Sequence, residues 1–142
     1  MNRNELLLSY VEKSLMHKRI FETEWYRHNT MDLSSTQTAA LSIIAKKGPL
    51  QAKELGLQLS LSSGGITTVC DKLLSRGLIR RLRSDGEDRR AVFLETTEEG
   101  RAMVIRTDAV WEQVLNVIFS VLTDAEIAML HQIYSKLVDP RT

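Results

Sequence analysis

One stretch, residues 61–97, constrains the fold most strongly, because its hydrophobic pattern changes period at Gly77. Before this glycine, apolar residues recur at steps of three and four, which predicts a helix over residues 63–76 with one buried face. That face comprises Ile66, Val69, Cys70 and Leu73. Either Ser62 or Ser63 can begin the helix, because a serine hydroxyl accepts a hydrogen bond from an unpaired N–H group of the first turn.

The residues after Gly77 predict a two-stranded hairpin. A glycine just beyond a helix end suits a left-handed backbone, and apolar and polar residues then alternate loosely over residues 79–83 and 91–96, as they do in strands. Between these segments, Asp85-Gly86 has the chemistry of a tight turn, since glycine accepts a positive φ without steric cost. The hairpin therefore has a charged tip with the sequence SDGEDRR.

The helix face opposite the apolar residues is small, polar and able to form hydrogen bonds. It carries Gly64, Thr67, Thr68 and Asp71, with Lys72 on its flank. Such side chains allow a close approach to the base edges and phosphates of DNA. The hairpin adds arginines, namely Arg80, Arg81 and Arg83 in its first strand and Arg89 and Arg90 at its tip. Together these features predict a helix that enters a DNA groove and a wing beside it.

The charge distribution supports the same surface. Net charge is only +1, but residues 46–90 hold ten Lys and Arg against five Asp and Glu, whereas residues 91–142 hold four against eight. Positive charge is thus concentrated in the segment that contains the helix and the hairpin, as expected of a surface that contacts phosphates. The alternative is a solvated surface on which charge clusters by chance.

Long helices flank this segment. Residues 4–28 contain neither glycine nor proline and predict one helix, with Leu8, Val11, Leu15, Phe21 and Trp25 mostly at helical spacing. At the usual rise, about 25 residues extend roughly 37 Å, longer than a small domain needs to cover its own core. We therefore expect this helix to offer a surface to a partner.

Capping signals mark the other helices. Ser34 with Gln37, and Thr123 with Glu126, have the spacing of capping boxes, and Thr97 is expected to begin a long fifth helix. The apolar stripes place Ala40, Leu41 and Ile44 inward in the second helix, Leu55 and Leu59 in the third, Met103, Thr107, Trp111, Val114, Ile118 and Val121 in the fifth, and Ile127, Leu130, Tyr134 and Leu137 in the last. Residues 52–60, a short turn and residues 63–76 then form a helix-turn-helix.

This chain resembles the MarR family of winged helix-turn-helix transcription regulators. The family pattern is a helix with S-G-x-T-x-x-x-D-x-L-x-x-x-G-L-[IV]-x-R, a wing with D-x-x-D-x-R, and then L-T-x-x-G. The matching residues are Ser63, Gly64, Thr67, Asp71, Leu73, Gly77, Leu78, Ile79, Arg81, Asp85, Asp88, Arg90, Thr97 and Gly100. Gly64-Gly65 is a common variant of the pattern, whereas Thr96 departs from it, standing where the family usually has leucine.

The resemblance implies a mainly α fold with a small β-hairpin wing, in which long N- and C-terminal dimerisation helices flank a winged helix-turn-helix head. It implies one domain over residues 1–142, with a DNA-binding head at residues 30–97 and dimerisation helices at residues 1–29 and 98–142. The expected function is that of a sequence-specific regulator of transcription that binds double-stranded DNA. We expect a ligand-responsive repressor that acts as a homodimer on a palindromic operator, with its reading helices about 34 Å apart.

The residues expected to contact DNA are Ser62, Ser63, Gly64, Thr67, Thr68, Asp71, Lys72, Arg81, Arg83, Asp88, Arg89 and Arg90. Lys72 and a serine at the helix start suit phosphates. At the tip we expect Arg90 to enter the minor groove, where negative potential is deepest over A·T tracts. Asp88 would order Arg90 in the free protein, and Arg89 would contact a phosphate. The alternative is a solvated turn without a DNA contact.

Family members often bind small aromatic or phenolic effectors, which release DNA. Trp25, Tyr26, Met31 and Trp111 are the candidate lining residues for such a site. The alternative, which we favour, is core and dimer packing, because aromatic residues at helical spacing usually belong to a core.

Other sensing chemistries have weaker support. Cys70 lies on the apolar side of its helix beside anionic Asp71, which disfavours a reactive thiolate, so we expect a structural residue rather than a redox sensor. Glu24 and His28 have the i, i+4 spacing of two ligands on one helix face. The other histidines are His17 and His131, and no third ligand or metal motif accompanies them. We therefore expect no metal and no cofactor.

Other functional classes fit the sequence less well. An enzyme is not expected, because the sequence holds no G-x-S-x-G and no phosphate loop. A winged helix that serves protein interaction only is a further alternative, which the basic wing tip opposes. A single cysteine suits a reducing cytoplasm. No apolar run approaches the ~18 residues of a membrane span, and the N-terminus lacks the pattern of a signal peptide. The expected partners are DNA, a second copy of the chain and a small effector, with no membrane.

Overall fold

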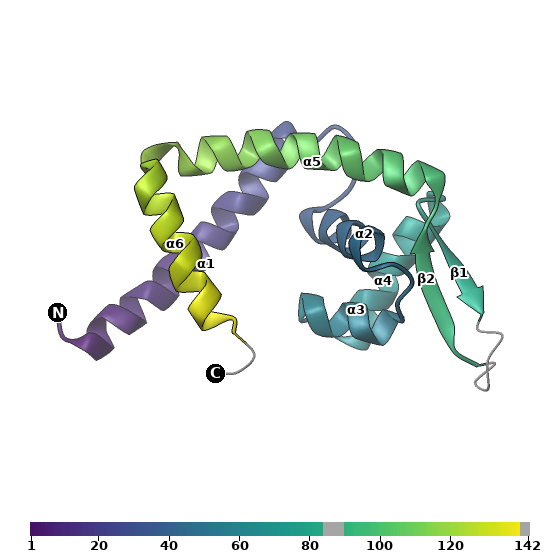
Figure 1. Cartoon of the computed structure of the whole chain (residues 1–142), viewed down its shortest axis with the longest axis horizontal. Helices are drawn as coiled ribbons and strands as arrows, with labels where there is room; N and C mark the ends of the chain where they lie inside the picture. The colour runs from purple at the N-terminus through teal and green to yellow at the C-terminus, as the bar shows by residue number, and fades with distance from the viewer. Residues whose placement is uncertain (84–89, 140–142) are drawn as a thin grey trace.

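The computed structural model describes residues 1–83 and 90–139. Its elements in chain order are α1 (Arg3–His28), α2 (Ser35–Lys47), α3 (Ala52–Leu59), α4 (Ser63–Ser75), β1 (Ile79–Arg83), β2 (Val92–Thr96), α5 (Glu98–Ile118), the 3-10 helix η1 (Phe119–Val121) and α6 (Asp124–Leu137). The described part of the chain is mainly helical, with one antiparallel pair of strands (Figure 1). The fold class predicted from the sequence is therefore confirmed.

The helices α2, α3 and α4 form a head with the hairpin β1–β2, on the right of Figure 1. Its core contains Leu41, Leu55 and Leu73, which are completely buried. All four residues predicted for the inner face of α4, namely Ile66, Val69, Cys70 and Leu73, are buried. Because one face of α4 is fixed against this core, the opposite face is presented to the outside.

The hairpin begins where the hydrophobic pattern changes period. Gly77 has a φ of 69°, in the left-handed region that glycine adopts without strain. β1 and β2 then pair antiparallel, with Ile79 opposite Thr96. Leu50, between α2 and α3, exchanges two backbone hydrogen bonds with Leu94 of β2, at 3.1 and 2.8 Å. The hairpin is therefore joined to the head both by the chain itself, which runs from α4 through Gly77 into β1, and by the hydrogen bonds between Leu50 and Leu94.

Side-chain caps begin α2, α4, α5 and α6 at the predicted residues. Ser62 Oγ accepts a hydrogen bond at 3.1 Å from the N–H group three residues further on, and Thr97 Oγ1 does the same at 3.0 Å. The capping boxes predicted at the starts of α2 and α6 are both present. α1 also begins with a capping box, made by Asn2 and Glu5, which the sequence analysis missed.

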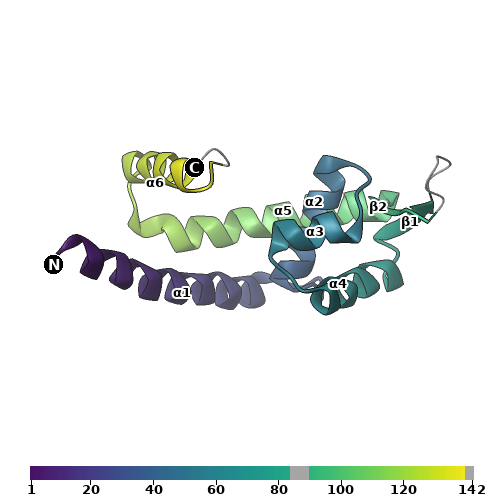
Figure 2. The same cartoon turned by 90° about the horizontal axis from the view of Figure 1, so that it is seen from below.

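The helix α5 leaves the wing and spans the molecule to its far end, where α6 turns back (Figure 1). α1 and α5 lie side by side (Figure 2), and Trp25 stacks on Trp111 between them, with ring centroids 4.7 Å apart. Nearer the N-terminus, the hydroxyls of Tyr10 and Tyr134 lie 3.1 Å apart and join α1 to α6. We call α1, η1, α6 and the C-terminal end of α5 the arm.

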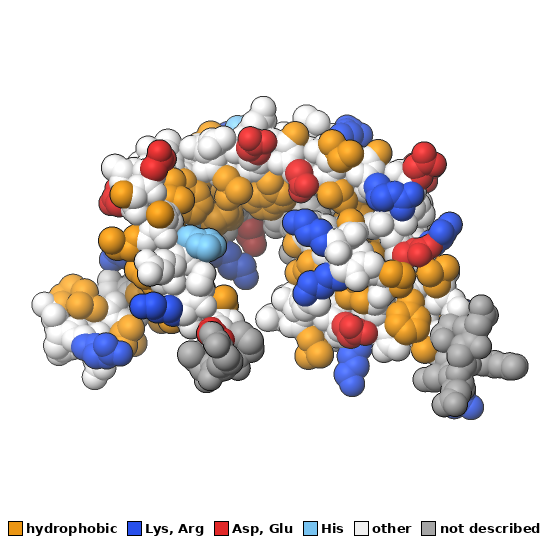
Figure 3. Space-filling model, in the orientation of Figure 1, with side chains coloured by type: hydrophobic (Ala, Val, Ile, Leu, Met, Phe, Trp, Pro, Cys, Tyr) orange, Lys and Arg blue, Asp and Glu red, His pale blue; other side chains and the backbone are white. Residues whose placement is uncertain are grey.

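The prediction that α6 buries its apolar stripe is wrong for the single chain. No residue of α6 is buried, and Ile127, Tyr134 and Leu137 are 40%, 40% and 62% exposed. Val121, predicted to lie in the stripe of α5, is also exposed. The reason is that α6 faces α1 across a hollow of about 900 Å³ and does not lie on the core. Figure 3 shows hydrophobic side chains gathered along the underside of α5 and over the arm.

Within the ranges described, no helix is by itself both long and apolar enough to cross a membrane. The α5 and α6 segments meet that test of length and composition only as a pair, bent by 107°.

Candidate nucleic-acid interface

The outer face of α4 is exposed along its length, as predicted for a surface that approaches DNA. The residues on it or at its start are Ser62, Ser63, Gly64, Thr67, Thr68 and Asp71, and all of them are exposed. Around Gly64 no heavy atom outside its own turn lies within 4 Å of the position that a Cβ would take. No side chain therefore covers the backbone of α4 at Gly64, and another molecule can approach it closely.

Two threonine hydroxyls on this face already have their hydrogens engaged. Thr67 Oγ1 donates to the carbonyl oxygen of Ser63 at 2.8 Å, and Thr68 Oγ1 donates to that of Gly64 at 3.0 Å. Each side chain therefore offers hydroxyl lone pairs and a methyl group to a neighbour. Such groups can accept a hydrogen bond from a base amino group or contact the methyl group of thymine.

The arginines of β1 divide between the two faces of the wing. Arg80 forms an ion pair with Glu95, its cross-strand neighbour on β2. Successive side chains of a strand point to opposite faces, so Arg81 and Arg83 share the face opposite Arg80, and both are exposed. Since Glu95 offsets the charge of Arg80, Arg81 and Arg83 are the better candidates for phosphate contacts on this strand.

The wing tip is described only in part. Asp88 and Arg89, two of the predicted contact residues, lie outside the described residues. Arg90 is described and is exposed just before β2 begins. The roles assigned to Arg90 and Asp88 from the sequence remain predictions.

A compact junction fixes the wing against both α4 and α5. Thr97 Oγ1 donates to the carbonyl oxygen of Gly77 at 2.6 Å, and the backbone N–H of Thr97 donates to that of Leu78 at 3.1 Å. A Cβ placed on Gly100 would lie only 1.9 Å from the carbonyl oxygen of Leu78. The T-x-x-G spacing noted in the sequence is thus explained: threonine caps α5 and binds the end of α4, and glycine lets the chains meet.

Lys72 does not extend freely from α4. Its Nζ lies 3.2 Å from Oδ2 of Asp32 in the connector, residues 29–33, which joins α1 to α2. The Asp32 side chain is 90% exposed, and exposed ion pairs of this kind contribute only about 0–1 kcal/mol. The DNA contact predicted for Lys72 requires it to leave Asp32 for a phosphate. Because the ion pair is weak, this exchange costs little free energy.

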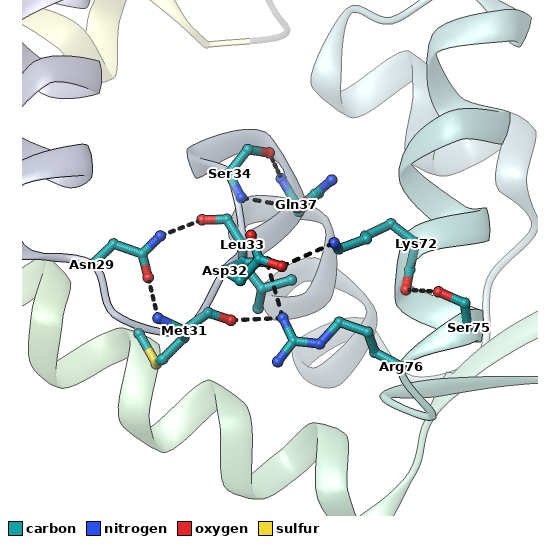
Figure 4. Close-up of polar contacts among 9 residues, drawn as sticks. All are labelled: Asn29, Met31, Asp32, Leu33, Ser34, Gln37, Lys72, Ser75 and Arg76. Atoms are coloured by element: carbon teal, nitrogen blue, oxygen red, sulfur yellow. Dashed lines mark hydrogen bonds and ion pairs between the residues drawn. The ribbon is translucent and has the colours of Figure 1, made fainter.

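Arg76 contacts the connector, and the sequence analysis did not predict this contact. Its Nη1 donates to the carbonyl oxygens of Met31 at 2.6 Å and of Asp32 at 3.0 Å (Figure 4). Asp32 itself has a φ of 53°, which is uncommon for a residue other than glycine. The available signal was that Lys72 and Arg76 are four residues apart, and so lie on one side of α4.

The four candidate effector residues do not line one cavity. Trp25 and Met31 belong to the core, at 0% and 5% exposed, whereas Tyr26 is 68% exposed. Trp111 borders a hollow of about 590 Å³ between α1, α2 and the α3–α4 turn, and Tyr26 borders a separate hollow of about 460 Å³ beside the connector. The two indole N–H groups are also engaged, since Trp25 donates to the carbonyl oxygen of Leu33 at 2.8 Å and Trp111 to Oγ1 of Thr38 at 3.1 Å.

Cys70 has the surroundings of a structural residue. Its side chain belongs to the head core and is 6% exposed. Burial raises the pKa of the thiol, the neighbouring Asp71 carboxylate raises it further, and Arg81 opposes both effects. The reactive thiolate is therefore disfavoured at neutral pH.

The histidines show contacts other than metal ligation. His28 Nδ1 lies 2.9 Å from the carbonyl oxygen of Glu24 and 3.7 Å from its Oε2, while Arg27 pairs with the same carboxylate at 3.0 Å. His17 packs edge-on against Phe21 at 4.8 Å. Among residues 1–83 and 90–139, no group of three His, Cys, Asp or Glu side chains is placed to hold a metal ion.

A head with a capped, exposed helix next to a two-stranded wing defines a winged helix-turn-helix protein. The MarR family model matches residues 33–92 of the chain. An HTH-type transcriptional regulator of Bacillus subtilis, YpoP, whose function is uncharacterized, is 33% identical over 106 residues, which are 75% of this chain and 74% of that protein. The chain therefore belongs to the MarR family and is a transcriptional regulator of that family.

Solved structures show the same fold. A mutant of MarR from E. coli complexed with operator DNA matches with a TM-score of 0.82 at 21% identity, covering 97% of this chain and 99% of that one. The PcaV transcriptional regulator from Streptomyces coelicolor, in complex with its natural ligand, matches with a TM-score of 0.76 at 21% identity, covering 94% and 93%. The relatives are regulators and not enzymes, which is consistent with the expectation that this chain is not an enzyme.

Proposed function

We propose that this protein binds double-stranded DNA as a homodimer at a palindromic site and represses transcription until a small effector releases it. The observation that carries the proposal is the outer face of α4. Its threonine hydroxyls, its glycine and its exposed N-terminal turn lie on a helix whose other face is locked into the core. That combination gives a rigid surface that can read base edges.

Within this proposal the residues act in two ways. Thr67, Thr68 and Asp71 contact bases, while Ser62 or Ser63 binds a phosphate at the start of α4. Arg81 and Arg83 face the DNA backbone from one side of β1. Lys72 leaves Asp32 for a phosphate on binding, and Asp88, Arg89 and Arg90 act at the wing tip as predicted from the sequence.

The homodimer is supported by the apolar surface of the arm. Leu8 and Leu15 of α1 are 68% and 64% exposed, and Leu137 of α6 is 62% exposed. Exposed apolar patches of this extent usually mark an interaction site. A second copy of the arm would cover them, which divides the chain into a DNA-binding head at residues 30–97 and dimerisation helices at residues 1–29 and 98–142. Two-fold symmetry then places two α4 helices about 34 Å apart, on successive turns of one DNA face.

The effector site belongs between the arm and the head. We assign it to the hollow of about 590 Å³ beside Trp111, which is bordered by α1, α2 and the α3–α4 turn. Its size suits a small aromatic or phenolic molecule. A molecule bound there would contact both the arm and the head, so it could change the position of α4.

Two experiments test the proposal. First, the protein is mixed with a random-sequence duplex at low salt; retardation of the duplex supports DNA binding, whereas its absence favours a winged helix that binds only protein. Second, duplexes that bind are enriched from a random pool and sequenced. We expect an inverted repeat whose half-site centres are about 10 base pairs apart. Enrichment of an asymmetric sequence would contradict the dimeric reading of DNA.

A further inference from the structure

The C-terminal part of α4 is fastened to the connector by two side chains. Arg76 Nη1 donates to the carbonyl oxygens of Met31 and Asp32, at 2.6 and 3.0 Å. One turn earlier, Lys72 Nζ lies 3.2 Å from Oδ2 of Asp32. Figure 4 shows both side chains reaching from α4 to the same short segment. We call the two hydrogen bonds that Arg76 donates to Met31 and Asp32 the clasp.

The connector is in turn held to the end of α1. The indole N–H of Trp25 and the side-chain amide of Asn29 both donate to the carbonyl oxygen of Leu33, at 2.8 and 2.7 Å. The Asn29 side-chain oxygen accepts from the backbone N–H of Met31 at 2.9 Å. Hydrogen bonds therefore run without a break from α1, through the connector, to Arg76 on α4.

The backbone at Asp32 is shaped to serve this arrangement. Its φ of 53° is a left-handed conformation, which is uncommon in residues other than glycine, although aspartate adopts it more readily than most. With this conformation, two successive carbonyl oxygens reach one guanidinium nitrogen. A hydrogen bond from a charged donor is among the stronger kinds, and the one to Met31 is partly buried. The clasp is thus a specific contact and more than a chance meeting of surface charges.

We propose that Arg76, through its hydrogen bonds to the carbonyl oxygens of Met31 and Asp32, is a positioning residue that sets how far apart the two α4 helices of the dimer stand, and hence which spacing of half-sites the protein accepts. This rests on the proposed function, in which α1 lies in the dimer interface and α4 reads DNA. The contacts of α4 with the core fix it within the head. The clasp attaches α4 to the connector, which is itself bonded to the end of α1, so the distance between the two α4 helices depends on the clasp.

The test uses the full-length protein and a series of duplexes that differ only in spacing. Each duplex carries the enriched half-site twice, with the spacer shortened or lengthened by one base pair, which changes the separation by about 3.4 Å and the relative rotation by about 35°. The affinity of each is measured by fluorescence anisotropy at one salt concentration. The variants are Arg76→Ala, which removes both hydrogen bonds to the connector, and Arg76→Gln, which keeps one donor. Lys46→Ala is the control, because it removes one positive charge at the opposite end of α2 from the connector.

For the parent we expect one preferred spacing. For Arg76→Ala we expect the ratio of the affinity at the preferred spacing to that at the next spacing to fall by about fivefold or more, which is the lower end of typical coupling between linked sites. Lys46→Ala should weaken all spacings by one common factor. A common factor in Arg76→Ala as well would overturn the proposal, because a loss of stability or charge alone acts equally on every spacing. If Arg76→Ala does not fold, Arg76→Gln, which keeps a donor for one carbonyl, decides by the same ratio. Absence of DNA binding by the parent would instead refute the proposed function.

Discussion

Gly100 provides the sharpest test of how the wing, α4 and α5 meet. An alanine Cβ at this position would lie 1.9 Å from the carbonyl oxygen of Leu78, whereas real Cβ atoms essentially never come within 3.0 Å of such a neighbour. In Gly100→Ala the start of α5 must therefore retreat by about 1 Å. That movement stretches the two hydrogen bonds that Thr97 donates to Gly77 and Leu78, at 2.6 and 3.1 Å.

The cost follows from these contacts. Two hydrogen bonds contribute about 1–3 kcal/mol together, and the strain of an overpacked contact adds about 1–3 kcal/mol. The better helix propensity of alanine returns up to about 1 kcal/mol. We therefore expect Gly100→Ala to lower the free energy of unfolding by about 3 kcal/mol, or the Tm by roughly 10 °C for a chain of this length.

The assay is urea and thermal unfolding followed by circular dichroism, at equal protein concentration because dimer stability depends on concentration. Gly64→Ala is the matched control: it is also a helical glycine, and no heavy atom lies within 4 Å of its Cβ position. Gly64→Ala should unfold at the parent's midpoint or slightly above it. If Gly100→Ala were as stable as Gly64→Ala, the close approach of Leu78 to α5 would be refuted.

Three further predictions follow from the site. Cys70→Ala should lose about 1 kcal/mol of stability for a small cavity and keep its DNA affinity. Because burial and Asp71 raise the pKa of the thiol, alkylation of the parent should be slow at pH 7 and accelerate only at more alkaline pH than for a free cysteine. Release of DNA by peroxide in the parent, absent in Cys70→Ala, would contradict this structural role. Arg90→Ala should weaken operator binding by ~1–3 kcal/mol and lower the salt dependence by about 1 per subunit. Asp88→Ala should weaken binding too if Asp88 orders Arg90, as the sequence predicts; tighter binding by Asp88→Ala would mean that simple charge repulsion explains the residue. Sedimentation at micromolar concentration should give about twice the chain mass of 16.2 kDa, and a monomer that still binds a palindrome tightly would argue against the dimer.

The head could be predicted from the sequence because its signals are local. The three- and four-residue spacing before Gly77, the glycine itself and the looser alternation after it placed α4, β1 and β2 within one residue of their observed bounds. Serine and threonine caps act within one turn, so Ser62 and Thr97 were likewise predictable. The T-x-x-G spacing was visible too, but its cause, the carbonyl of Leu78 beneath Gly100, depends on how three elements cross.

What escaped the sequence depends on contacts between distant segments. Arg76 is separated from Met31 by 45 residues, and no local pattern shows that the end of α4 faces the connector. The same reason explains the error at α6. An apolar stripe predicts that one face of a helix is covered, but it does not show whether the covering surface belongs to the same chain. The candidate effector residues do not share one cavity, in part because Trp25 and Tyr26 are adjacent in α1 and therefore point in different directions.

One measurement tests most directly the claim that α4 of a symmetric dimer reads DNA. Sequences that bind are enriched from one random duplex pool in parallel with the parent and with Thr68→Ala, which removes a hydroxyl and a methyl from the exposed face of α4 and leaves the core unchanged. We predict an inverted repeat for the parent, and for Thr68→Ala the same repeat with relaxed base preference at one position in each half, related by the two-fold axis. An identical consensus for both proteins, or a change in only one half, would contradict the account.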